Sequence, residues 1–109
     1  MTPRELRIAV RDGRMTAVDP SIYINGYPPP LEWPKWKRDR LRAAIRAAIL
    51  FMRGTGWRGV MGDLSRRGFL KKETVSKARV AQYVKVGIAY LMKQGCFEVV
   101  KNSGKKSDS

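Results

Sequence analysis

Histidine is absent from this chain, cysteine occurs once, and only nine residues are acidic. Without histidine, the usual imidazole-based acid, base and nucleophile pairs cannot be assembled, and Cys96 alone cannot complete a common transition-metal site. A single cysteine also excludes an internal disulfide. These absences predict a protein that is not an enzyme and that uses no metal or other cofactor.

Long apolar runs are missing as well. No run approaches the roughly 18 residues that a membrane-spanning helix needs. The N-terminus begins Met1-Thr2-Pro3-Arg4-Glu5 and continues with further charges, so it lacks the uninterrupted apolar segment of a signal peptide. We therefore expect a cytoplasmic protein that has no membrane partner.

Positive charge is what the chain has in excess. Its 109 residues include 23 Lys and Arg, which gives a formal net charge of +14. A net charge of about 2 to 8 keeps a small domain soluble, so this excess predicts an anionic polymer as the partner. Residues 1–34 carry four arginines and four acids, and the whole excess lies beyond them. We predict a neutral N-terminal arm over 1–34, a basic helical domain over 35–102 and a flexible polar tail over 103–109.

The first half of the arm fits two structures. Thr2 and Glu5 have the spacing of a capping box, and apolar residues follow at helical spacing as far as Gly13, which predicts a short helix. The alternation over residues 6–10 also fits a strand that turns at residues 12–13 into a second strand over 15–18.

The second half of the arm is rich in proline and aromatic residues. Residues 21–34 hold four of the six prolines, which argues against a regular helix because proline lacks a backbone donor and restricts its neighbours. The aromatic side chains in and just after this segment either pack on the chain's own domain or form a protein-binding arm. They are Tyr23, Tyr27, Trp33 and Trp36.

Three helices are predicted in the basic domain, over residues 34–53, 57–67 and 74–94. Each ends just before a glycine, at Gly54, Gly68 and Gly95 respectively, and the first begins with a proline. The expected core stripe of the last helix is Val80, Val84, Gly87, Ile88 and Leu91. A β-prone segment over 96–101 follows that helix.

The helix over 34–53 has several faces. Its core stripe is Leu41, Ala44, Ile45, Ala48 and Met52, with Arg38, Arg42 and Arg46 on a flank that either reaches a nucleic-acid backbone or is simply solvated. A second face of small residues, Ala43, Ala47 and Leu50, suits the arm or a second copy in a homodimer. A basic amphipathic helix also fits a membrane surface, although this apolar face is small for that purpose.

Three stretches carry a family resemblance. Val60 to Leu64 with Gly68 and Phe69 looks like a first helix and its glycine turn, and Thr74 to Val80 looks like the opening of a recognition helix. Tyr90 to Val100 is similar to the passage from a recognition helix into a wing strand. Over residues 37–106 the chain thus resembles the winged-helix branch of the helix-turn-helix superfamily. The resemblance implies a mainly α fold, with a three-helix body, a short C-terminal β wing and an irregular N-terminal arm before them.

The resemblance also implies a function, namely sequence-specific binding of duplex DNA by a transcription regulator. The start of helix 74–94 would lie in the major groove, with cations around it on the phosphates. The nucleic-acid-binding residues so expected are Arg66, Arg67, Lys71, Lys72, Thr74, Ser76, Lys77, Arg79, Lys101, Lys105 and Lys106.

Two other functions fit the same charge. One is a small protein of viral or plasmid type that modulates a larger nucleic-acid machine through its aromatic arm and basic helices. The other is RNA binding, with Tyr and Trp stacked on unpaired bases. Asp63 and Glu73 have the spacing of an imaginable catalytic pair, but we expect them to be helix-end charges that pair with neighbouring cations, and we expect Cys96 to be a small buried residue.

Overall fold

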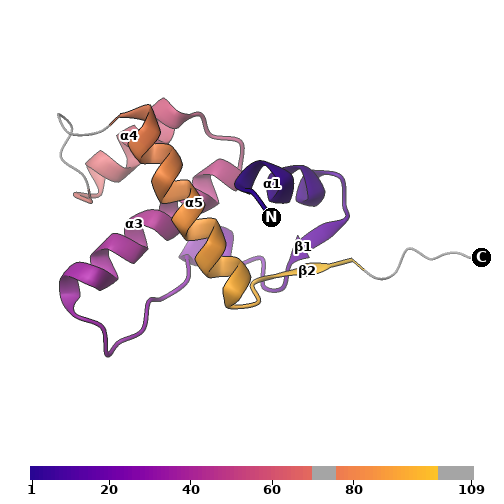
Figure 1. Cartoon of the computed structure of the whole chain (residues 1–109), viewed down its shortest axis with the longest axis horizontal. Coiled ribbons are helices and arrows are strands. Elements are labelled where there is room, and N and C mark those ends of the chain that lie inside the picture. The colour runs from indigo at the N-terminus through magenta and orange to yellow at the C-terminus, as the bar shows by residue number, and fades with distance from the viewer. Residues whose placement is uncertain (70–75, 101–109) are drawn as a thin grey trace, which may run out of the picture.

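The computed structural model describes residues 1–69 and 76–100. In chain order its elements are α1 (Pro3–Arg11), β1 (Met15–Ala17), α2 (Ile22–Asn25), α3 (Lys35–Met52), α4 (Trp57–Arg66), α5 (Lys77–Lys93) and β2 (Phe97–Val99). Figure 1 shows the long helices grouped on one side and the two strands side by side on the other. The prediction of a mainly helical chain with a short strand after its last helix is confirmed.

Helices α3 and α5 cross at the centre of the molecule (Figure 1). Gly87 permits this crossing, because a Cβ atom there would collide with the carbonyl group of Ala44 and would lie 2.8 Å from the Cβ of Ala48. The absence of a side chain therefore lets the two backbones touch. The buried residues of α5 are Val80, Val84, Gly87, Ile88 and Leu91, which confirms the predicted core stripe.

Helix α3 is buried on two faces. Its predicted stripe is buried apart from Met52, which is only partly covered. Its second face is buried too, with Ala43, Ala47 and Leu50 exposing 2%, 0% and 8% of their surface. The chain itself thus covers the small-residue face that the sequence also offered to a second copy.

The N-terminal arm contributes a helix and a strand to this core. At the start of α1, Glu5 N–H donates to Thr2 Oγ1 at 3.1 Å and Thr2 N–H donates to Glu5 Oε1 at 2.7 Å, which completes the predicted capping box. Strand β1 pairs antiparallel with β2, so that Met15 faces Val99 and Ala17 faces Phe97. The first predicted structure of residues 3–11 is confirmed, and the hairpin over the same residues is wrong because the partner of β1 comes from the other end of the chain.

The proline-rich segment is less irregular than predicted. Residues 22–25 form α2, a single helical turn in which Asn25 N–H donates to the carbonyl of Ser21 at 2.8 Å. No proline occurs between Pro20 and Pro28, so nothing prevents one turn there. The exclusion of helix over 21–34 was therefore too broad, and the arm is not irregular throughout.

Two features differ from the winged-helix resemblance. Strand β2 pairs with β1 instead of a second C-terminal strand, and these are the only strands within residues 1–69 and 76–100. Residues 67–76 separate α4 from α5, whereas the turn of a helix-turn-helix has about 3–4 residues.

Helix α5 also begins later than predicted. Ser76 is extended, and its hydroxyl accepts the N–H of Arg79 at 3.2 Å, which makes it the N-cap. The helix therefore starts at Lys77 and not at Thr74, which lies outside the described residues. None of the described helices combines the length and apolarity needed to cross a bilayer.

Candidate nucleic-acid interface

The structure describes five of the predicted nucleic-acid contacts, namely Arg66, Arg67, Ser76, Lys77 and Arg79. The other six, Lys71, Lys72, Thr74, Lys101, Lys105 and Lys106, lie outside the described residues. The five come from the end of α4 and the start of α5, which lie at the same end of the molecule (Figure 1). Lys77 and Arg79 are exposed there, and the Ser76 hydroxyl accepts the capping hydrogen bond from the N–H of Arg79.

Asp63 on α4 binds the arginines around it. Arg46 donates to both of its carboxylate oxygens, from Nε at 3.1 Å and from Nη2 at 3.2 Å, and Arg67 Nε donates at 2.9 Å. These bonds, those of Arg46 above all, hold the pKa of the Asp63 carboxyl below its ordinary value. The expected pairing of Asp63 with neighbouring cations is confirmed, while Glu73 lies outside the described residues.

This pairing divides the two arginines at the end of α4. Arg67 Nε forms a close ion pair with Asp63 at 2.9 Å. Arg66 lies 3.9 Å from that carboxylate and keeps 75% of its side chain exposed. Of the two, Arg66 is thus the more available to a ligand.

Three arginines on α3 donate hydrogen bonds to acceptors within the chain. Arg38 Nε donates to the carbonyl of Trp33 at 3.0 Å, Arg42 Nη1 donates to Asp39 at 2.9 Å, and Arg46 holds Asp63. The sequence predicts either contact with a nucleic-acid backbone or solvation for this flank, and both stay predictions. Acceptors within the chain bind each guanidinium, while the Arg42 side chain keeps 43% of its surface exposed.

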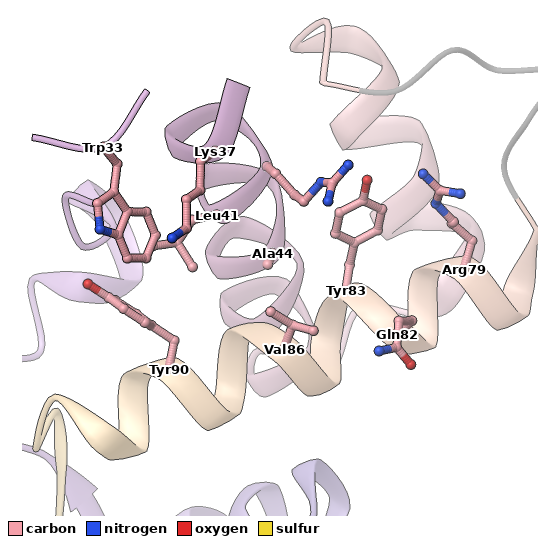
Figure 2. Close-up of a pocket in the computed structure, with 10 residues that line it drawn as sticks. Trp33, Lys37, Leu41, Ala44, Arg79, Gln82, Tyr83, Val86 and Tyr90 are labelled. Atoms are coloured by element: carbon pink, nitrogen blue, oxygen red, sulfur yellow. The ribbon is translucent and has the colours of Figure 1, made fainter. Parts of the chain in front are cut away.

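A groove lies between the first half of α3 and the exposed side of α5. We call it the α3/α5 groove; it encloses about 610 Å³ and is lined by Trp33, Lys37, Arg40, Leu41, Ala44, Arg79, Gln82, Tyr83, Val86 and Tyr90. Figure 2 shows Trp33 and Tyr90 on one side, Tyr83 and Arg79 on the other, and Val86 between them. The described lining contains three cations and no acidic residue.

Cations lie against the aromatic walls of this groove. Lys37 Nζ is 4.0 Å from the centroid of the Trp33 ring, and Arg79 Cζ is 5.6 Å from that of Tyr83. Cation–π attraction of this kind orients the charged groups without neutralising them, so they stay available to an anion.

A second hollow of about 490 Å³ shares Arg40 and Tyr83 with the groove and adds Arg67. Arg40 on α3, Arg67 at the C-cap of α4 and Arg79 on α5 therefore line two hollows that share Tyr83, and we call these three arginines the cationic patch. Asp39 also lines this hollow, but Lys35 and Arg42 each hold it at 2.9 Å.

Sequence reasoning missed Lys37 and Arg40. The signal was present, since Lys37, Arg40 and Ala44 recur at helical spacing on α3, as do Arg79, Tyr83, Val86 and Tyr90 on α5.

The aromatic residues of the predicted protein-binding arm divide into two groups. Tyr27 and Trp33 meet Tyr90 edge to face, with centroids 6.1 and 6.3 Å apart, and Tyr23 packs against the core, where burial raises its pKa. Trp36 remains 62% exposed. Packing within the chain thus accounts for three of the four residues.

Cys96 is buried, as expected, and burial raises the pKa of its thiol, which disfavours the reactive thiolate.

Comparison of the chain with protein-family models, with curated proteins and with solved structures gave no match. Charge and geometry are therefore the grounds for assigning a function.

Proposed function

We propose that this protein binds nucleic acid, that its ligand is duplex DNA, and that it acts as a transcription regulator in the manner of winged helix-turn-helix proteins. The observation that carries the proposal is that Arg40 on α3, Arg67 at the C-cap of α4 and Arg79 on α5 line adjoining hollows beside the exposed start of α5. Neighbouring arginines repel one another, and a bound anion offsets this repulsion. DNA presents anionic phosphates at regular intervals.

In this proposal, α5 is the helix whose side chains contact the base edges. Its exposed residues include Lys77, Arg79, Gln82 and Lys85, separated by Ala78 and Ala81, which are small enough to let the helix approach a groove floor. Arg and Gln side chains pair with guanine and adenine edges respectively, and each good pair discriminates by about 1–3 kcal/mol. Arg66 and the cationic patch would bind the phosphates on either side.

A salt titration tests the partner class. Duplex DNA, single-stranded DNA and structured RNA are each titrated by fluorescence anisotropy at one fixed salt concentration, and the best ligand is then titrated from low to high salt. Contact with six to eight phosphates predicts a slope of log K against log salt of roughly −5 to −7. A slope near zero contradicts the proposal, and preference for RNA over duplex DNA replaces it with the RNA-binding alternative.

A pair of variants then tests the position of the interface. Arg79→Gln and Arg4→Gln each remove one positive charge, but Arg4 lies on α1, outside the patch. Arg79→Gln should weaken duplex binding and reduce the magnitude of the salt slope by about 1, whereas Arg4→Gln should change neither appreciably. Equal effects would show that only the net charge matters.

A further inference from the structure

We propose that the α3/α5 groove is a docking site for an acidic amphipathic helix of a partner protein. This binding function does not depend on the proposed DNA binding, although the groove shares Arg40 and Arg79 with the cationic patch. It rests on the apolar floor of the groove, on its length and on the charge around it.

The floor of the groove is aliphatic. Leu41, Ala44 and Val86 form it, and Val86 leaves 43% of its surface in water. Aromatic side chains border this floor on both sides, with Trp33 and Tyr90 facing Tyr83 across the gap in Figure 2. Such a cleft suits a large apolar anchor residue, the kind of contact that carries most of the binding energy at interfaces.

The length of the groove fits a helix. Its lining runs along α5 from Arg79 to Tyr90, a span of about 16 Å at 1.5 Å per residue. A docked helix of about three turns would cover that span, with apolar anchors at i, i+3, i+4 and i+7.

The positive charge around the groove predicts acidic residues beside the apolar anchors of the partner helix. Lys37, Arg40 and Arg79 border the apolar floor, and none of them has a carboxylate partner among the ion pairs of the described residues. Asp or Glu residues beside the partner's anchors would meet these cations, while a basic partner would be repelled.

The aromatic rings are poorly placed to stack on unpaired bases. Lys37 Nζ occupies one face of Trp33, Arg79 lies over Tyr83, and Trp33 and Tyr27 both meet Tyr90 edge to face. Stacking platforms for single strands present open ring faces in succession. The geometry therefore favours a helix with apolar anchors over a nucleotide.

The test uses three synthetic peptides of about 14 residues, long enough to form helix when docked. The probe has Leu at i, i+3, i+4 and i+7 and Glu on its flanks; one control replaces every Leu with Ala, and the other replaces every Glu with Lys. Fluorescence anisotropy of the labelled probe should show saturable binding to the full chain. Each control should bind at least tenfold more weakly.

Variants of the protein locate the site. Val86→Gln should weaken probe binding at least tenfold, and Ala89→Gln, on the same helix but outside the groove lining, should leave it unchanged. Circular dichroism checks that both variants fold. Absence of saturable binding, equal binding of either control peptide, or equal effects of the two variants would each overturn the proposal.

A final arm separates this proposal from the DNA-binding one. A single-stranded oligothymidylate is titrated against the wild type and Val86→Gln; if the oligonucleotide loses affinity in the variant and the acidic probe never binds, the groove is a nucleic-acid site and the docking proposal is wrong. The duplex titration is scored independently, so its failure would leave a positive peptide result standing.

Discussion

The two flanks of α3 carry the same kind of side chain and use it differently. On one flank, Arg38, Arg42 and Arg46 bind acceptors within the chain. On the other flank, Lys37 and Arg40 border the α3/α5 groove, where the described lining offers no carboxylate. Position on the helix thus decides whether a cation supports the fold or remains available to a ligand.

The difference shows that charge density along the chain does not by itself identify an interface. Arg46 is a cation on a strongly basic helix, yet its side chain is only 21% exposed and is held by both oxygens of Asp63. Arg40 is six residues earlier, has its Cζ atom 5.4 Å from the centroid of the Trp36 ring and forms no ion pair within the described residues. What separates them is the acceptor brought in by α4, which only the tertiary structure supplies.

The largest expected effect on stability comes from disturbing the close crossing of α3 and α5. Gly87→Ala places a methyl group against the Ala44 carbonyl and Ala48, and forcing α3 and α5 apart should cost about 3 kcal/mol of unfolding free energy, well above the gain of about 1 kcal/mol in helix propensity. Urea denaturation measures it. Gly62→Ala is the control, since only the flexible Arg66 side chain lies near that site, and it should be neutral or stabilising.

Removing the carboxylate that binds Arg46 should have the next largest effect on stability. Asp63→Asn leaves Arg46 and Arg67 without their shared carboxylate, and the loss of charge-assisted hydrogen bonds at a site only 14% exposed should destabilise the chain by about 2 kcal/mol. Denaturant unfolding at pH 7 checks this value. An unchanged midpoint would mean that the cluster forms without adding stability.

The same carboxylate gives a pH dependence of known sign. Because the arginines lower its pKa in the folded state, the stability it contributes is fully present above its unfolded pKa of about 4 and is lost as the pH falls through the lower folded value. The difference in stability between wild type and Asp63→Asn should therefore be constant from about pH 5 to 7 and shrink below about pH 4. A difference that grows in acid would contradict the assignment.

Much of the fold could be predicted from the sequence because its signals are local. The capping box of Thr2 and Glu5, the glycines that end the helices and the buried stripe of α5 all lie within a few turns of chain. The pairing of β1 with β2 could not be predicted, since it joins residues some 80 positions apart and each strand is only three residues long.

The site was less predictable for a related reason. The cationic patch draws its arginines from α3, from the C-cap of α4 and from α5, so no single window of sequence contains it. Five predicted contacts fall in the described residues and lie at one end of the molecule, but their bonds could not be foreseen: Arg67 is shared with Asp63, and the Ser76 hydroxyl caps α5. Periodicity finds a buried stripe more readily than the stripe beside it, because burial leaves a hydrophobic signal and exposure leaves a mixed one.

The smallest expected effect on stability is also the sharpest test of the comparison. Arg40→Gln and Arg46→Gln each remove one positive charge from α3. Arg46→Gln should lower the unfolding free energy by about 1.5 kcal/mol, because Asp63 loses its bidentate partner, while the folded variant keeps the wild-type salt slope for duplex DNA. Arg40→Gln should stay within about 0.5 kcal/mol of the wild type and reduce the magnitude of that slope by about 1. If the two variants instead changed stability and salt slope alike, the two flanks would be equivalent in solution, and the division between cations of the fold and cations of the interface would have to be abandoned.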